Sequence, residues 1–332
     1  MLDLIKSDGS NLSIVIQGAL SSLEETSKII HSYELFLPKA EIIISTWNDY
    51  ANFASRHDKV VISDDPGPID FSRFGGRAQH NFNRQIVSSK NGLNNASRSF
   101  SLKVRSDLVL VNNNLVENYN NALKNSHKLN QEFFLNKPLL AISNESSKKP
   151  SLFPAYLHFC DWFILGTTNE VKKLFSCSVV NLEDMTYKNN ELIPAVYKKL
   201  NLPEIKWSVE TYIWTNYFKK YYRFEMINEF DNSKIIKEVH NQIISSNLII
   251  LDQKRAGITV LKKMYANRAF FKYSYEYSYD DWLLASSRIN ISTILTVKLK
   301  IKVYLADLIK KSYSIYVKLK MKLKSLFYSN QA

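Results

Sequence analysis

Three short apolar runs, each ending in polar residues, constrain the fold of this chain most strongly. They occupy residues 13–18, 41–47 and 59–63, and their isoleucines and valines follow one another without regular polar alternation. A helix-length stretch separates the first two runs, and its apolar residues recur at helical spacing between Ile29 and Leu37. Short, continuously apolar strands that alternate with helices are typical of a parallel sheet. The sequence therefore predicts an α/β fold.

Polar side chains end or follow several of these predicted strands. In open α/β sheets, ligands bind beyond the carboxyl ends of the strands. That rule places the following residues near one another: Gln17, Trp47, Asp64, Asp65 and Asp107. Turn chemistry alone also explains Asp64 and Asp65, because Pro66 and Gly67 follow them. The alternative is that one of the two carboxylates contacts a nucleoside.

The segment 100–110 has a strand pattern that carries two cations, Lys103 and Arg105, and then Asp107. A carboxylate at a strand end, beside cations, indicates a site for a phosphate-bearing ligand. Such a carboxylate can bridge Mg²⁺ or Mn²⁺ to phosphate oxygens, because these ions prefer oxygen ligands. The other interpretation is a buried aspartate that pairs with Arg105 or Lys103 and needs no metal.

A helix is predicted within residues 81–98, where the apolar residues form one stripe and Arg84 and Lys90 fall off it. Both cations are candidates for neutralising phosphate, and arginine is the better bidentate partner. The stripe consists of Phe82, Ile86, Leu93 and Ala96. A solvated amphipathic helix explains the same pattern.

Two carboxylates later in the chain are candidates for a general base. Asp161 lies in the apolar, strand-like segment 156–166, where a carboxylate needs partners. Glu210 lies in the first turn of a predicted helix, 209–220, for which Ser208 is a plausible N-cap. Glu210 has a structural explanation as well, since acids in a first turn stabilise the helix dipole. His158 is expected to be a hydrogen-bonded core histidine.

Composition restricts the possible locations and partners. The two cysteines, Cys160 and Cys177, cannot form a disulfide framework, and residues 1–8 lack the blocks of a signal peptide, so we expect a reducing cytoplasm. No apolar run reaches the roughly 18 residues that span a bilayer. The net charge is +13, and residues 296–332 alone hold nine lysines and one aspartate. A nucleic-acid binder is expected to be basic across a folded domain rather than in a tail.

The chain resembles the WavE family of lipopolysaccharide-synthesis proteins. The resemblance lies in blocks that occur in family order over about the first two thirds of the chain, and the most specific are 83–93 and 103–107. The other blocks are 13–18, 43–47, 63–67 and 161–163. The resemblance implies a bacterial glycosyltransferase of surface-polysaccharide assembly, with a glycosyltransferase-A-like, Rossmann-type mixed sheet flanked by helices.

In that fold a strand-end Asp-any-Asp motif binds Mg²⁺ or Mn²⁺, but this chain has Arg105-Ser106-Asp107. The resemblance therefore leaves Asp107 as a single metal ligand and suggests that Arg105 supplies part of the positive charge. It assigns to the nucleotide-sugar donor Gln17, Asp64 or Asp65, Arg84 and Lys90. It assigns Asp161 to the acceptor side, and it favours Glu210 as the base of an inverting transfer.

Three parts are expected along the chain. Residues 1–112 form the nucleotide-sugar-binding half, 113–293 the acceptor-binding half of the same domain, and 294–332 a basic amphipathic tail. The tail has both a strand-like alternation and a helical ladder, and the helical interpretation predicts a segment lying on an anionic membrane surface. This suits an enzyme with a lipid-linked glycan acceptor at the inner face of the bacterial inner membrane. Two other hypotheses are a non-catalytic scaffold of the polysaccharide machinery and a nucleic-acid binder.

Overall fold

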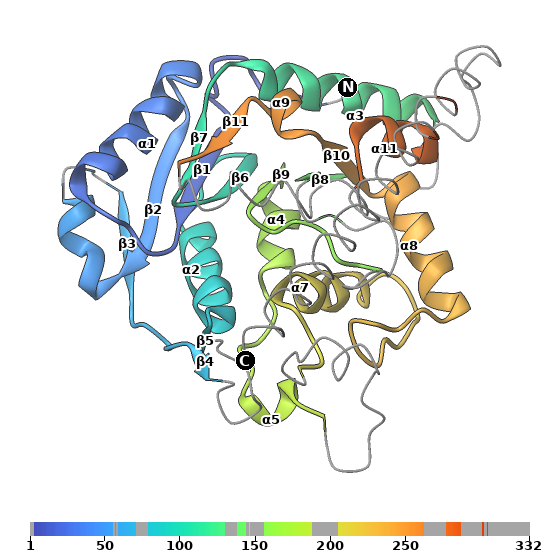
Figure 1. Ribbon diagram of the computed structural model, residues 1–332. Coiled ribbons are helices and arrows are strands. Elements are labelled where there is room, and N and C mark those ends of the chain that lie inside the picture. The colour runs from blue at the N-terminus through green and yellow to red at the C-terminus, as the bar shows by residue number, and fades with distance from the viewer. Residues whose placement is uncertain are drawn as a thin grey trace, which may run out of the picture.

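A mixed sheet organises the described part of the chain (Figure 1). The computed structural model describes residues 3–55, 57, 59–70, 79–129, 138–143, 146, 156–187, 205–261, 277–286, 301 and 304. Within these residues, the main sheet has seven strands in the order β10-β8-β9-β6-β1-β2-β3. They are β1 (Leu12–Gln17), β2 (Glu41–Trp47), β3 (Val60–Ser63), β6 (Phe100–Arg105), β8 (Leu139–Ile142), β9 (Phe163–Thr167) and β10 (Leu248–Leu251).

Strand direction confirms the predicted fold class, a mixed α/β sheet flanked by helices. β1 is parallel to β2 and to β6, β2 is parallel to β3, and β8 is parallel to β10. β9 runs antiparallel to both of its neighbours, β6 and β8. The helices are α1 (Leu23–Phe36), η1 (Asn48–Ala54), α2 (Phe82–Asn94), α3 (Asn114–Leu129), α4 (Thr168–Leu174), α5 (Leu182–Met185), α7 (Val209–Phe218), α8 (Lys234–Ser246), α9 (Gln253–Ala256) and α11 (Tyr279–Ser286).

Helix α2 packs directly on β1 and β2, which confirms the helix predicted within residues 81–98. The predicted apolar stripe is buried. Gly92 allows the close approach, because a Cβ atom there would lie 2.5 Å from Val15 Cγ1 and 2.7 Å from Ser45 Cβ. Helix α2 therefore covers the sheet face that carries Val15 and Ser45.

Two strand predictions are wrong in part. Residues 100–110 form two strands, because the chain turns at Ser106, whose N–H donates to the Gln17 carbonyl at 3.0 Å. The second strand, β7 (Leu108–Leu110), pairs with β11 (Ile258–Val260) outside the main sheet. In the segment 156–166, only the residues from Phe163 onward are strand. Leu157 has φ 59°, a left-handed conformation that extended backbone does not contain.

The basic tail predicted at 294–332 lies outside the described residues, except for positions 301 and 304. Among the helices that the structure describes, none is both long enough and apolar enough to span a bilayer. The main sheet takes strands from both sides of residue 112, since β8, β9 and β10 follow it. A small two-stranded ribbon, β4 (Ile69–Asp70) with β5 (Gln79–His80), lies apart from this sheet.

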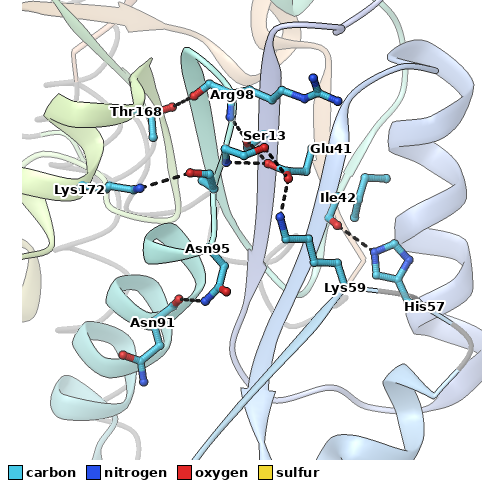
Figure 2. A network of polar contacts seen from close by, with 12 residues as sticks. Ser13, Glu41, Ile42, His57, Lys59, Asn91, Asn95, Arg98, Thr168 and Lys172 are labelled. Atoms are coloured by element: carbon cyan, nitrogen blue, oxygen red, sulfur yellow. Dashed lines mark hydrogen bonds and ion pairs between the residues drawn. The ribbon is translucent and has the colours of Figure 1, made fainter.

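A polar network joins the amino ends of β1, β2 and β3 (Figure 2). Glu41 at the start of β2 accepts hydrogen bonds from Ser13 and Lys59, and also from the N–H and hydroxyl of Ser97 at 2.9 and 2.8 Å. Partial burial raises the pKa of Glu41, but these hydrogen bonds outweigh it and bring the pKa to about 2. This edge of the sheet is thus held together by one ionised carboxylate.

Candidate functional site

The carboxyl ends of the central strands meet at the opposite edge of the sheet. Gln17 ends β1 beside Arg105, which ends β6, while Trp47 ends β2 beside Ser63 of β3. Because β9 is antiparallel to β6, its first residue, Phe163, lies opposite Val104 at this same edge. The reversed strand therefore delivers the segment before it, with Asp161 and Trp162, to the ends of β1 and β6.

Arg105 and Asp107 form the ion pair that was one of the two interpretations of this motif. Arg105 Nε donates to Asp107 Oδ1 at 2.6 Å, and Nη2 donates to Oδ2 at 2.9 Å. The guanidinium carbon lies 3.7 Å from the centre of the Trp162 ring, which is a cation–π contact. The Arg105 N–H also donates to the Trp162 carbonyl at 2.9 Å. Arg105 is thus fixed by a carboxylate and an aromatic face.

Lys103 and Asp161 form a second group of ionisable residues, which lies next to the Arg105–Asp107 pair and is more deeply buried. Both residues are 0% exposed, and the Lys103 ammonium donates to the Asp161 carbonyl oxygen. Neither carboxylate oxygen of Asp161 has a hydrogen-bond partner among the described residues. Burial raises the pKa of Asp161, although the charges of Lys103 and Arg105 act in the opposite direction. A buried carboxyl group without side-chain hydrogen bonds is costly, and the nearby charges of Lys103 and Arg105 offset part of that cost.

Glu210 lies where the sequence predicted it, in the first turn of α7. Ser208 is the N-cap, and its hydroxyl accepts from the Thr211 N–H at 3.3 Å. Burial lowers the pKa of Lys103 to about 8, while the charges of Asp161 and Glu210 raise it. The structure therefore brings both candidate bases within electrostatic reach of the same buried lysine.

His158 lies beside the start of α7 and is partly buried. Its Nδ1 lies 3.0 Å from both the Ser208 and the Thr211 hydroxyl oxygens. Burial lowers the pKa of His158 to about 4, which favours the neutral ring at pH 7. The two contacts agree with the expected hydrogen-bonded histidine, although the side chain lies at the border of the core rather than inside it.

The remaining predicted donor residues are spread along α2 and the loop after β3. Asp65 receives Arg84 Nε at 2.7 Å, and this hydrogen bond lowers the pKa of Asp65 despite some burial. Asp65 also accepts the Gly67 N–H at 3.0 Å, as expected for a turn. Asp64 is exposed and accepts from the Asn48 amide at 3.3 Å.

Gln17 is 3% exposed, and its side-chain oxygen accepts from the Ser88 hydroxyl at 2.6 Å. This bond ties β1 to α2. Lys90 is exposed and lies six residues beyond Arg84, about 9 Å further along the helix axis. The structure therefore groups Asp65 with Arg84 and buries Gln17 under α2, and it places Lys90 further along the helix.

A family model described as WavE lipopolysaccharide synthesis matches residues 12–316. The chain belongs to the WavE lipopolysaccharide synthesis family. This confirms the resemblance and extends it over nearly the whole chain. No curated protein matches this WavE chain.

Solved structures similar to this WavE protein include two of Drosophila β1,4-galactosyltransferase 7. One is its catalytic domain with xylobiose, which is 13% identical and has a TM-score of 0.27 over 49% of this chain and 52% of that chain. The other is a mutant with manganese, UDP-Gal and xylobiose, also 13% identical, with a TM-score of 0.26 over 49% of this chain and 51% of that one. The chain thus matches about half the length of these structures.

Two features of the candidate site were not predicted from the sequence. The contact of the Trp162 ring with the Arg105 guanidinium is the first of them. Lys103 was noted as a cation, but its complete burial was not predicted. The sequence offered one signal, the spacing of Lys103 and Arg105. Residues two apart on a strand lie on the same face, so this spacing places both cations on one side of β6.

The residues at this edge do not fit a divalent-metal site. Both oxygens of Asp107 accept from the Arg105 guanidinium. Across the described ranges, no three His, Cys, Asp or Glu side chains gather where they could hold a metal ion. A Mg²⁺ or Mn²⁺ site usually needs several oxygen ligands, whereas Asp107 here is already paired with a cation and Asp161 is fully buried.

Proposed function

We propose that this WavE protein is a glycosyltransferase that transfers a sugar from a nucleotide-sugar donor to a growing lipopolysaccharide or capsular glycan. Membership of a lipopolysaccharide-synthesis family supports the pathway. The observation that carries the proposal is the convergence, at one sheet edge, of Arg105, Asp107 and Trp162 above the Lys103–Asp161 pair. A partly exposed cation next to a carboxylate in a dry setting suits the transfer of a sugar from a charged leaving group.

The donor is proposed to lie along the carboxyl ends of β1, β3 and β6. Arg105 faces its diphosphate, and the Asp64–Asp65 turn contacts its nucleoside. The Asp65–Arg84 pair supports this arrangement, because it holds the turn against the start of α2. Gln17 acts through its bond to Ser88, by fixing α2 on β1. Lys90 is proposed to contact the donor.

Glu210 is proposed as the base. It removes the proton of the acceptor hydroxyl while that oxygen attacks the anomeric carbon, and the bond from this carbon to the phosphate oxygen breaks as the new glycosidic bond forms. The proton ends on the carboxylate, and the nucleoside diphosphate leaves with the bonding electrons. This single displacement inverts the anomeric configuration. Asp161 is the second candidate, because burial raises its pKa and so strengthens it as a base.

The acceptor is proposed to be a lipid-linked glycan at the cytoplasmic face of the inner membrane. The support is the lysine-rich sequence of residues 296–332, whose spacing suits a basic helix on an anionic surface. The protein would then be peripheral to that membrane.

A ligand-binding screen tests the proposal. Thermal unfolding is measured with a panel of nucleotides and nucleotide sugars, with and without Mn²⁺, since a ligand of the folded state raises the melting temperature. At least one nucleotide sugar is expected to stabilise the protein, and the same compound should be consumed when a glycan acceptor is added. No shift with any nucleotide would refute the proposal.

Variants at the two candidate bases separate an enzyme from the alternative, a non-catalytic scaffold that keeps the fold. Glu210→Gln is expected to lower turnover by about 10²-fold or more while nucleotide binding persists, because general-base catalysis contributes on this scale. Asp161→Asn should reduce it less. A scaffold would bind nucleotide with no turnover on any donor, and neither variant would change that result.

A further inference from the structure

The position of Arg105 sets it apart from the other cations of this edge. It is the last residue of β6, with β1 on one side and β9 on the other, so it lies at the middle of the carboxyl edge. Lys103, two residues earlier, lies on the same face of the strand. Two positive charges therefore stand one behind the other, one buried and one at the rim.

The Arg105 side chain is also held before any ligand arrives. Asp107 binds its Nε and Nη2 in a bidentate pair, and the Trp162 ring lies 3.7 Å from the guanidinium carbon. The Arg105 side chain is 18% exposed, whereas that of Asp107 is 7% exposed. Of the two partners, the cation is thus the one that faces solvent, and the carboxylate lies behind it.

We propose that Arg105 binds the donor diphosphate and takes the charge-neutralising role that a divalent cation has in glycosyltransferase-A enzymes, with Asp107 as a positioning residue. This inference rests on the proposed function, and it changes the role of Asp107 from metal ligand to support of an arginine. It follows from the donor set, in which both Asp107 oxygens are already bound by the guanidinium.

A guanidinium suits this task for two physical reasons. Its planar set of N–H groups matches the oxygens of a phosphate, and a charge-assisted hydrogen bond of this kind is stronger than a neutral one. Negative charge grows on the phosphate oxygen as the sugar leaves, and a cation held by Asp107 and Trp162 stabilises that charge without having to reorient. Lys103, buried behind Arg105, adds a second basic group to this edge, next to Asp161.

Titration calorimetry of the full chain tests the inference. The probes are UDP, GDP, CDP, ADP and inorganic pyrophosphate, each in EDTA and in Mn²⁺. At least one is expected to bind in EDTA, with an affinity that Mn²⁺ changes by less than about threefold. Arg105→Gln should weaken that binding by about tenfold or more, because it removes hydrogen bonds to a charged group. The affinity of Arg105→Lys should fall between those of wild type and Arg105→Gln, since lysine keeps the charge but lacks the planar set of N–H groups.

Arg255→Gln is a matched control. Arg255 also pairs with a carboxylate, Asp252 at 2.9 Å, and it also lies over an aromatic ring, Tyr279 at 4.5 Å from the ring centre. It belongs to α9 and has no proposed role in binding. Its replacement should leave the affinity for the diphosphate unchanged, which separates the effect of position from that of losing any paired, stacked arginine.

The outcomes distinguish this inference from the proposed function. Binding that needs Mn²⁺ and disappears in Asp107→Asn would overturn the role of Arg105 and leave the glycosyltransferase proposal intact. Wild-type affinity in Arg105→Gln would also overturn it, and circular dichroism spectra check that each variant is folded. If no nucleotide or pyrophosphate binds under any condition, both proposals fail.

Discussion

Replacing Glu41 with glutamine is expected to destabilise the fold in a pH-dependent way. Glu41 joins the amino ends of three strands (Figure 2), and its side chain is 13% exposed. Its pKa falls from 4.5 to about 2 on folding, because the hydrogen bonds from Lys59, Ser13 and Ser97 outweigh the opposing effect of burial. At about 1.4 kcal/mol per pKa unit, this corresponds to at most about 3.5 kcal/mol of stability at neutral pH.

The sign of the pH dependence follows from the lowered pKa. The folded state releases the Glu41 proton more readily than the unfolded state, so this stabilisation is complete above the unfolded pKa of 4.5. It is lost as the pH falls through the folded pKa of about 2. The difference in unfolding free energy between wild type and Glu41→Gln should therefore shrink by roughly 1 kcal/mol between pH 6 and pH 3.5.

Urea unfolding at several pH values between 6 and 3.5 measures this difference. The control is Glu24→Gln, because Glu24 forms an exposed ion pair with Lys28 at 2.6 Å. Exposed pairs contribute little, so this variant should unfold like wild type. If Glu41→Gln is no less stable than Glu24→Gln, or if its effect is the same at every pH, the network does not stabilise the sheet as argued.

Two further predictions concern the packing beneath the site. Gly92→Ala should lower the unfolding free energy by about 1–3 kcal/mol, because the new Cβ would meet Val15 and Ser45. The control, Asn94→Ala on the same helix, should change it little. Equal melting temperatures of the two variants would contradict the close packing. Lys103→Met should be more stable than wild type, and by a larger margin at pH 7 than at pH 10. Burial lowers the Lys103 pKa to about 8, so the cost of burying its charge disappears and wild type becomes more stable as the pH rises from 8 toward 10.5. A gain that does not depend on pH would show that Lys103 is not buried as a cation.

The sequence by itself determined the local elements and the family. Apolar runs with strand spacing predicted β1, β2 and β3, and a helical stripe predicted α2. Ser208 was recognised as an N-cap from its own neighbourhood. These features depend on residues a few positions apart, so periodicity and capping rules suffice to find them. The ordered blocks pointed to the WavE family in the same way, without any knowledge of contacts.

Tertiary structure decided which contacts the central motif makes. The sequence left open whether Asp107 pairs with Arg105, and it gave no sign that Trp162 would cover the guanidinium. That contact exists because β9 runs antiparallel to β6 and returns Trp162 to the end of β6, 57 positions along the chain from Arg105. Strand direction and the burial of Lys103 depend on how distant segments pack, and the energy of an ion pair depends on that surrounding medium. Local pattern carries neither, so only the folded chain shows that Asp107 pairs with Arg105.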